Sequence, residues 1–247
     1  MKKTIYPLAI VVLLLSCKKE SSNPSTTTTT AIAKYGNGVT DIEGNTYKTF
    51  TIGTQTWMAE NLKTSKYNDG TSIPNVKDSL EWLKLTTGAW CYYDNDNKYN
   101  AKYGKLYNWY AVDSTTNGNK NVCPTGWHVP TDAEWSVLTD YLGGRNVAGG
   151  KMKEVGTTSW DSPNTNATNT SLFTGLPGGY RKGNCNYCGD NSYEGVCVLI
   201  GARGYWWSSS ELSGGNSWFR SLSRDEGDVH RGGLDFDSGF SVRCLKD

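Results

Sequence analysis

The sequence carries almost no net charge, few methionines and only two histidines. Lys and Arg number 25 against 24 Asp and Glu, and this balance excludes a basic nucleic-acid binder and a protein with a strongly acidic tail. Hydrophobic residues make up only 36% of the 247-residue chain. Because Leu, Ile and Met are scarce beside the aromatic residues, the composition argues against a helix bundle.

No motif of a common enzyme class is complete in the chain. His128 and His230 are the only histidines, and Ser208–Ser210 lack the Gly-x-Ser-x-Gly pattern of a nucleophile elbow. No Gly-x-Gly-x-x-Gly segment follows a predicted strand, so the usual signal for dinucleotide binding is missing. Carboxylates occur in pairs, but their spacing does not identify a glycosidase. We therefore interpret His128 as structural and expect no catalytic residue and no enzyme activity.

Metal-binding patterns are incomplete in the same way. Cys185 and Cys188 have the spacing of two zinc ligands, but a second cysteine pair or a histidine pair is missing. Residues 94–97 begin like a calcium-binding loop, yet Lys98 and Tyr99 occupy its fifth position and its glycine position. We predict no cofactor and no metal site, and a structural calcium without a ligand motif stays an open alternative.

The N-terminus is predicted to be a targeting segment. Its apolar run, 5–15, is too short for the ~20 residues that span a bilayer and is typical of a signal peptide. The run ends in Leu-Leu-Ser-Cys, which resembles the bacterial lipobox and implies cleavage before Cys17 and attachment of acyl chains such as palmitate. An ordinary signal peptide with an incidental cysteine is the alternative. We expect a bacterial cell-envelope protein that is lipid-anchored, in the outer membrane.

The chain divides into three predicted parts. Residues 1–16 are the signal peptide, and 17–38 form a polar Ser/Thr-rich tether that includes five consecutive threonines. Residues 39–247 form one domain, which is large enough to bury ~70% of its unfolded surface. Six cysteines remain apart from Cys17, and an even number in an exported chain favours disulfides. These six are Cys91, Cys123, Cys185, Cys188, Cys197 and Cys244.

Trp, Tyr and Gly are abundant, with 10, 15 and 28 residues, a composition typical of short strands and ordered loops. The clearest helix begins at Thr131, which forms a capping box with Glu134. Trp135, Leu138 and Leu142 form its apolar stripe. Gly143 and Gly144 are expected to end it.

A shorter helix is predicted over 103–112, with Tyr110 inward. Strands are predicted over 205–208 and 217–222, with one of the adjacent Trp206 and Trp207 inward and the other outward. Alternation over 240–244 predicts a half-buried final strand. Few helices followed by many antiparallel strands predict an α+β domain.

Six ordered motifs together resemble the Fibrobacter succinogenes major paralogous domain family, which is common in Bacteroidetes lipoproteins. The resemblance covers nearly all of 39–247. The motifs lie at Ile52–Leu62, Tyr103–Trp109, Cys123–Pro130, Leu176–Arg181, Trp207–Ser210 and Gly239–Cys244.

The family looks like a branch of the C-type lectin-like superfamily, related to the formylglycine-generating-enzyme fold. This implies a compact α+β domain in which two helices flank small antiparallel sheets with long ordered loops. It also implies that the N- and C-terminal strands lie side by side. The calcium-ligating triplets of many C-type lectins are absent from the sequence, so calcium-dependent sugar binding is not expected.

Closure of that fold implies a bond between Cys123 and Cys244, with Cys91–Cys244 as the rival. Cys197 is then expected to pair within its own loop, with Cys185 or Cys188.

In lectin-like folds the last strands and their loops form an exposed face. Here this stretch, 213–238, interleaves aromatic residues with charges of both signs, a mixture suited to protein or glycan recognition. The alternative is a solvated hairpin face with Trp218 in the core. The candidate ligand-binding residues are Asn216, Trp218, Arg220, Arg224, Asp228, His230, Arg231 and Asp235.

The sequence thus predicts a membrane-anchored, non-catalytic binding or adhesion module for a glycan or a surface protein. Its expected partners are the membrane, through the N-terminal lipid, and that ligand, with no nucleic acid. A structural or assembly subunit of a cell-envelope or fimbria-like complex is the alternative. An enzyme on the same fold is a third reading.

Overall fold

The computed structural model describes residues 33–184 and 194–247, together with Met1. The predicted signal peptide 1–16, the lipidated Cys17 and most of the tether lie outside the described residues. Cys185 and Cys188 lie outside them as well. Within the described ranges, no helix is long and apolar enough to cross a membrane.

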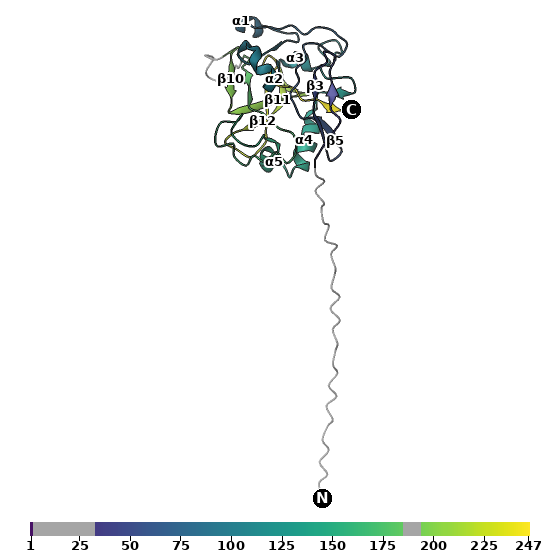
Figure 1. The fold of residues 1–247 in the computed structure, drawn as a ribbon, viewed down its shortest axis with the longest axis vertical. Helices are drawn as coiled ribbons and strands as arrows, with labels where there is room; N and C mark the ends of the chain where they lie inside the picture. Colours follow the sequence, from purple (N-terminus) through teal and green to yellow (C-terminus); the bar gives the residue numbers. More distant parts are fainter. Residues whose placement is uncertain (2–32, 185–193) are drawn as a thin grey trace. The chain divides into compact units, whose positions relative to one another are not determined.

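One five-stranded sheet joins the two ends of the domain (Figure 1). All its neighbouring strands are antiparallel. Leu245, near the C-terminus, lies opposite Trp57 on one side and His128 on the other. The expectation that early and late strands lie side by side is therefore confirmed. In spatial order the strands are β1 (Lys34–Tyr35), β4 (Thr49–Ile52), β5 (Gln55–Met58), β14 (Leu245–Lys246) and β8 (Trp127–His128).

The second five-stranded sheet carries the long C-terminal hairpin. β9 and β11 run parallel, and the other neighbours are antiparallel. The β11–β12 turn is Gly214–Gly215, and both glycines have positive φ, 60° and 85°, a conformation that favours glycine. In spatial order the strands are β10 (Cys197–Ile200), β9 (Gly178–Arg181), β11 (Arg203–Ser213), β12 (Asn216–Ser223) and β13 (His230–Asp235).

The remaining elements are two-stranded ribbons and short helices. The two-stranded ribbons are β2 (Val39–Thr40) with β3 (Thr46–Tyr47), and β6 (Trp90–Cys91) with β7 (Leu106–Tyr107). The helices are α1 (Ser79–Trp82), α2 (Asn100–Tyr103), α3 (Trp109–Val112), α4 (Asp132–Tyr141), α5 (Arg145–Met152), η1 (Tyr93–Asn95) and η2 (Asn97–Tyr99). Several small sheets with few helices agree with the predicted α+β class.

The helix predicted from Thr131 is confirmed as α4. The Thr131 hydroxyl accepts a hydrogen bond from the Glu134 N–H at 3.2 Å, and Glu134 Oε2 accepts one from the Thr131 N–H at 2.8 Å. Trp135 and Leu138 are fully buried. Gly143 and Gly144, with φ of 100° and 92°, follow the last turn and stop the helix as expected.

The helix predicted over 103–112 was wrong in its first half. Leu106 and Tyr107 form β7 instead, because their backbone pairs with β6 and the Tyr107 N–H donates to the Phe240 carbonyl. Tyr103 ends a separate helix, α2, and after it only Trp109–Val112 is helical in this range. Asn108 caps this turn by accepting the Ala111 N–H at 3.2 Å. Tertiary pairing thus overrides the local pattern here.

The ordered domain begins earlier than the predicted boundary at residue 39. Ala33 is buried, and Lys34 and Tyr35 pair with Thr51 and Phe50. The polar composition of this segment concealed the strand, because its backbone hydrogen bonds, rather than its side chains, attach it to the sheet.

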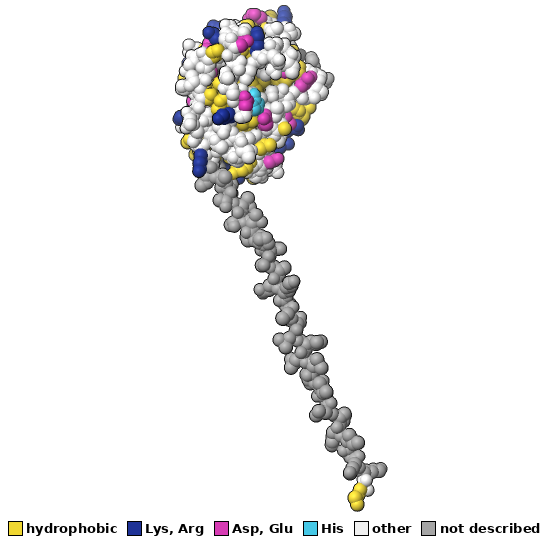
Figure 2. Space-filling model, turned by 90° about the vertical axis from the view of Figure 1, so that its right-hand side faces the viewer, with side chains coloured by type: hydrophobic (Ala, Val, Ile, Leu, Met, Phe, Trp, Pro, Cys, Tyr) yellow, Lys and Arg dark blue, Asp and Glu magenta, His cyan; other side chains and the backbone are white. Residues whose placement is uncertain are grey.

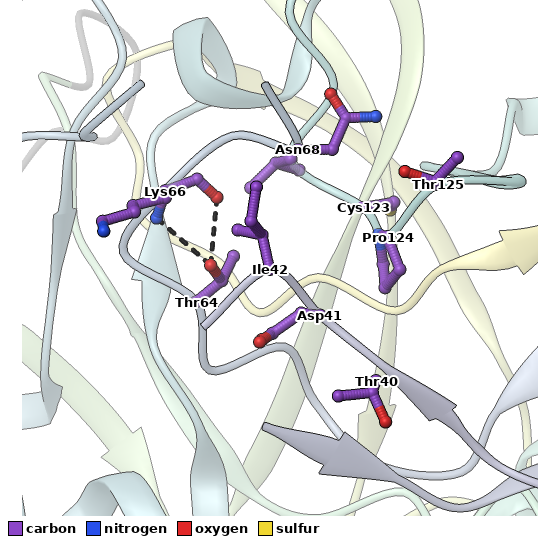
Figure 3. Close-up of a pocket in the computed structure, with 10 residues that line it drawn as sticks. Thr40, Asp41, Ile42, Thr64, Lys66, Asn68, Cys123, Pro124 and Thr125 are labelled. Carbon is purple, nitrogen blue, oxygen red and sulfur yellow. Dashed lines mark hydrogen bonds between the residues drawn. The ribbon is translucent and has the colours of Figure 1, made fainter. Parts of the chain in front are cut away.

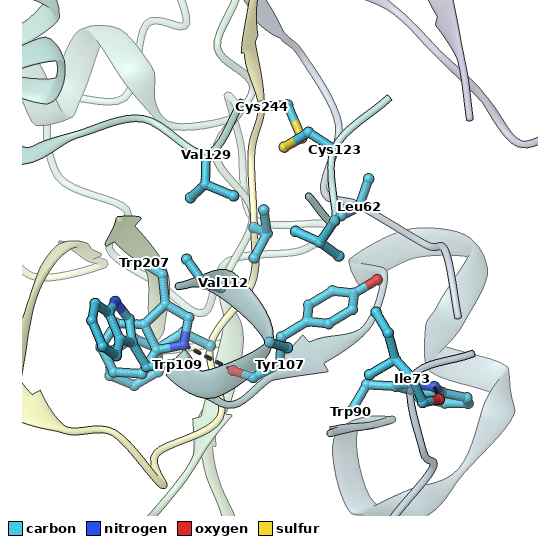
Figure 4. Close-up of a cluster of buried hydrophobic side chains, with 14 of the residues drawn as sticks. Leu62, Ile73, Trp90, Tyr107, Trp109, Val112, Cys123, Val129, Trp207 and Cys244 are labelled. Carbon is cyan, nitrogen blue, oxygen red and sulfur yellow. Dashed lines mark hydrogen bonds between the residues drawn. A yellow bond between two sulfur atoms is a disulfide. The ribbon is translucent and has the colours of Figure 1, made fainter. Parts of the chain in front are cut away.

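Trp206 and Trp207 point to opposite faces of β11, as alternation requires, but both are buried. Trp206 packs with Phe173, their ring centroids 5.4 Å apart, and Trp207 packs with Phe240 at 4.1 Å. Figure 4 shows Trp207 beside Trp109, with the indole N–H of Trp207 donating to the Tyr107 carbonyl. The expected outward tryptophan was wrong because packed clusters cover both faces of this sheet.

The final segment is buried on both sides too, so the prediction of a half-buried strand over 240–244 was wrong. Every residue from 240 to 245 is buried, including Ser241 and Arg243. The Arg243 guanidinium donates to Asn61 Oδ1 at 2.8 Å and to the Thr174 carbonyl at 3.1 Å. A buried cation is tolerated here because each of its three nitrogens donates to an acceptor, including Nη1 to the Phe173 carbonyl.

Candidate functional site

The predicted disulfide between Cys123 and Cys244 is present. Their Cα atoms lie 5.9 Å apart and both residues are fully buried. Figure 4 shows the bond at the edge of a cluster of buried hydrophobic side chains, near Leu62 and Val129. It joins the segment before β8 to the segment before β14, and these two strands pair in one sheet.

Cys91 and Cys197 do not form the expected pairs. Cys91 is a buried free thiol, so the rival bond Cys91–Cys244 was wrong. Cys197 is a free thiol as well, which contradicts its pairing with Cys185 or Cys188. β10 instead brings Cys197 against a small buried cluster that contains Cys91, and the two thiols are hydrogen-bonding partners. The buried residues of this cluster are Val76, Trp82, Ala89, Cys91, Tyr93 and Leu106.

Arg220 is not on an exposed face, so that expectation was wrong. Its side chain is 1% exposed, and its guanidinium donates to Asp132 Oδ1 at 2.8 Å and to the Asp132 carbonyl at 3.0 Å. Burial of such a charge is costly unless it is paired. Arg220 therefore joins β12 to the first turn of α4 and is not placed to contact a ligand.

Trp218 and Arg231 form a stacked pair beside Arg220. The Arg231 guanidinium lies 3.4 Å from the centroid of the Trp218 ring and donates to both carboxylate oxygens of Asp132, at 2.9 and 2.8 Å. Although partial burial of Asp132 opposes it, the hydrogen bonds from Arg231 and Arg220 lower the pKa of this carboxyl. The half-buried Trp218 thus presents a ring already covered on one face.

The remaining candidates are spread over the second sheet and the loop before β13. Arg224 is partly exposed and pairs with Asp161 at 3.1 Å. Asp228 lies beside α5, where its carbonyl meets the backbone of Gly149. His230 is exposed at the start of β13. These residues do not form one site with the Asp132 cluster.

Asn216 and Asp235 lie opposite each other at the far end of β12 and β13. Asp235 there contributes to a hollow of about 270 Å³, which we call the first hollow. Its other walls come from the loop after α1, from α3 and from the turn between β11 and β12. The lining residues are Leu83, Lys84, Leu85, Thr86, Tyr110, Asn184, Gly215, Asp235, Phe236 and Asp237.

Asp237 brings an unusual carboxyl to the first hollow. It is 7% exposed, and its Oδ2 accepts hydrogen bonds from the backbone and side-chain nitrogens of Asn184 at 2.9 and 2.8 Å. Its Oδ1 has no hydrogen-bond partner among the described residues. Burial raises the pKa of both Asp237 and Asp235. Because its unpaired Oδ1 is itself buried, Asp237 lines the hollow without offering this oxygen to a ligand.

A second hollow of about 270 Å³ adjoins the first and shares Thr86 and Tyr110 with it. We call the two together the Tyr110 groove. Tyr110 was expected to point inward, but its ring is only half-buried and meets Phe236 edge-on at 5.6 Å. The rest of the second hollow is lined by Tyr67, Ser72, Pro74, Thr87, Gly88, Thr116, Asn117 and Lys120.

Sequence reasoning found only Asp235 of this groove as a ligand-binding candidate. The other lining residues come from segments between 67 and 237 that carry no shared motif. Only the alternation of Asp235 and Asp237 with Leu234 and Phe236 was a usable signal.

A third hollow, of about 200 Å³, lies beside Cys123 (Figure 3). Its polar groups are largely engaged within the protein. Asp41 accepts hydrogen bonds from the Tyr47 hydroxyl at 2.6 Å and from Asn45 Nδ2 at 2.8 Å. The Thr64 hydroxyl bonds both the carbonyl and the N–H of Lys66. Few polar groups of this hollow are therefore free to contact a ligand.

Charge and metal-binding groups do not single out another site. On the face that Figure 2 presents, basic and acidic side chains are scattered among polar and apolar ones. In the part of the chain that the structure describes, no group of three or more His, Cys, Asp or Glu residues could hold a metal ion.

Comparison with known proteins identifies a family. The model of the Fibrobacter succinogenes major domain family matches residues 50–246. This confirms the family expected from the six motifs. No curated protein and no solved structure matches the chain.

Proposed function

The chain belongs to the Fibrobacter succinogenes major domain family, and from this premise we propose that it is a non-catalytic binding module. Its ligand is a hydroxyl-rich polymer, an extracellular glycan, which occupies the Tyr110 groove.

One observation carries the proposal: two hollows of about 270 Å³ meet at Thr86 and Tyr110. A chain of linked sugar rings needs adjacent subsites, whereas a small metabolite is usually enclosed in one deeper pocket. The half-buried ring of Tyr110 lies at the junction, where an aromatic surface can pack on the apolar face of a sugar.

The polar lining supports a neutral, hydroxyl-rich ligand. The first hollow presents Lys84 and Asp235, and the second presents Lys120. The amides of Asn184 and Asn117 also line the groove, but they are hydrogen-bonded within the protein. Carboxyl and ammonium groups both hydrogen-bond hydroxyls. Because both signs of charge line the groove, a strongly charged polymer would meet repulsion at one end or the other.

The proposed setting is the bacterial envelope. The apolar run and the Leu-Leu-Ser-Cys motif support a signal peptide over 1–16 and a lipid anchor on Cys17, which would hold the domain at the outer membrane. The small sheets and the pairing of β14 with β5 support a C-type lectin-like domain.

The test is a glycan and polysaccharide screen of the full chain in detergent, with and without EDTA. We expect binding that survives EDTA and weakens about tenfold or more in Tyr110→Ala, because loss of one well-packed contact of ~1.4 kcal/mol has that effect. Asp235→Asn should weaken the same ligand.

Two variants serve as controls. Lys66→Ala alters the hollow of Figure 3 and should leave glycan affinity unchanged. Trp218→Ala tests the hairpin face. Loss of binding in Trp218→Ala with retention in Tyr110→Ala would place the ligand on that face and overturn the groove. A protein that binds nothing in the panel would contradict glycan recognition and favour an assembly role.

A further inference from the structure

Two free cysteines from distant parts of the chain meet at the edge of the small buried cluster. Cys91 ends β6, and Cys197 begins β10. Cys197 packs against the buried cluster that contains Cys91, and the two thiols are hydrogen-bonding partners. Cys91 is fully buried among apolar side chains, whereas Cys197 is half-buried. One sulfur is therefore enclosed while its neighbour is nearer to solvent.

The surroundings shift the pKa values of the two thiols in opposite directions, down for Cys197 and up for Cys91. The hydrogen bond from Cys91, the backbone N–H of Asp94 and the charge of Arg181 together lower the pKa of Cys197, although burial opposes this. Burial and the Cys197 sulfur raise the pKa of Cys91. A lowered pKa and partial exposure mark an attacking thiol, and the buried partner can then resolve a mixed disulfide.

Arg181 is held rigidly in this position. Its Nε donates to the Gly195 carbonyl at 2.8 Å and its Nη1 to the Val76 carbonyl at 2.8 Å, while the guanidinium lies 4.4 Å from the centroid of the Trp82 ring. The positive charge beside the two sulfurs is thus part of the folded framework.

We propose that Cys91 and Cys197 are an oxidisable thiol pair that closes a second disulfide, between β6 and β10, by exchange with a disulfide of the surroundings. The Cys197 thiolate attacks one sulfur of the external disulfide, whose S–S bond breaks and releases one thiolate. The Cys91 thiol passes its proton to that thiolate and attacks Cys197, which releases the second thiolate; this takes its proton from water. Two protein thiols are oxidised, and one external disulfide is reduced to two thiols.

The new bond would anchor an edge strand. β10 lies at the end of its sheet and pairs with β9 alone among the described strands. A bond to Cys91 would tie it to the β6–β7 ribbon, which belongs to a different sheet.

The test is to reduce the full chain, titrate it with oxidised glutathione and map its disulfides by peptide mass spectrometry. We expect a Cys91–Cys197 peptide pair alongside Cys123–Cys244, and a higher thermal midpoint than that of the reduced chain. In Cys91→Ser, Cys197 should accumulate as a stable mixed disulfide with glutathione, because no resolving thiol remains.

The controls separate this pair from the other thiols. The double variant Cys185→Ser/Cys188→Ser should still form the Cys91–Cys197 bond. Alkylation of the reduced wild type should label Cys197 well before Cys91. This measurement needs no variant that could misfold. The proposal is overturned if oxidised wild type links Cys197 to Cys185 or Cys188, or if Cys91 and Cys197 stay reduced while glutathione oxidises other thiols.

Discussion

At the scale of single residues, this fold uses buried cations to satisfy loop carbonyls. Lys153 Nζ donates to three carbonyl oxygens, those of Thr165, Ser223 and Glu226, at 2.7 to 2.8 Å. Burial lowers the pKa of Lys153 to about 8. Arg243 plays a similar role toward the Thr174 carbonyl. Loop carbonyls that lack a strand partner need another donor, and a long cationic side chain supplies several at once.

Arg243→Ala is expected to lower the free energy of unfolding by about 3 kcal/mol, because buried acceptors lose charged donors and a cavity is left. Arg243→Lys should lose less than Arg243→Ala, because the ammonium keeps a charged donor at this place. Some loss remains, because one ammonium cannot reach all the acceptors. Urea denaturation with an unchanged m-value measures the loss. Lys246→Ala, at an exposed position nearby, is the matched control and should change stability by under ~0.5 kcal/mol. Equal losses in the two alanine variants would refute the role of Arg243.

At the scale of elements, side chains connect strands and helices that do not pair through their backbones. His128 on β8 places Nε2 3.0 Å from Glu134 Oε1 on α4 and Nδ1 2.6 Å from Asp247 Oδ1. The structural role predicted for His128 is in keeping with these contacts. Burial alone would lower the pKa of His128, but the bonds to Asp247 and Glu134 outweigh it and raise the pKa above 6.5.

A raised pKa in the folded state makes stability depend on pH near neutrality. The folded protein holds the His128 proton to a higher pH than the unfolded chain does, so the stabilisation is complete below pH ~6.5 and is lost as pH rises through the folded pKa. Thermal midpoints measured from pH 5 to 9 should therefore fall more in wild type than in His128→Gln. His230→Gln, which leaves the His128 contacts intact, should keep the wild-type fall. A His128→Gln curve parallel to wild type would rule out this linkage.

Helix α5 is packed against the loop before β13 so closely that one helical position must be glycine. A Cβ atom on Gly149 would lie 1.8 Å from the carbonyl oxygen of Asp228. Gly to Ala inside a helix normally stabilises by ~1 kcal/mol. Gly149→Ala should instead destabilise by about 2 kcal/mol, as overpacking does.

The matched control for Gly149→Ala is Asn146→Ala in the same helix, where the side chain is exposed. It should be neutral or slightly stabilising in the same urea titration. If Gly149→Ala is stabilising too, then the loop moves aside freely and the close packing has no energetic consequence.

At the scale of the whole molecule, the Cys123–Cys244 bond closes the domain. It links residues 121 apart in sequence, and closure of a loop of this size restricts the unfolded chain by ~4–5 kcal/mol. The double variant Cys123→Ala/Cys244→Ala should lose about that much in the free energy of unfolding, measured by urea titration. A loss below ~1 kcal/mol would mean that the pairing of β14 with β5 and β8 holds the ends together unaided.

The Tyr110 groove also exists only at this scale. The walls of its first hollow come from the loop after α1, from α3, from Asn184 and from the end of the β12–β13 pair, and those of its second hollow also from 67–74 and 116–120. These segments lie far apart in the sequence, so no spacing rule relates them. The same holds for Cys91 and Cys197, which six cysteines with fifteen possible pairings could not single out.

By itself the sequence determined the α4 helix, the strands of the C-terminal hairpin, the family and the Cys123–Cys244 bond that the family implied. Each of these rests on a local pattern or on motifs that can be read along the chain. The tertiary structure alone decided that Trp206 and Trp207 are both buried, that Arg220 pairs with Asp132, and where the hollows of the Tyr110 groove lie. Local periodicity sets which way a side chain points, but what covers it depends on segments brought together by the fold.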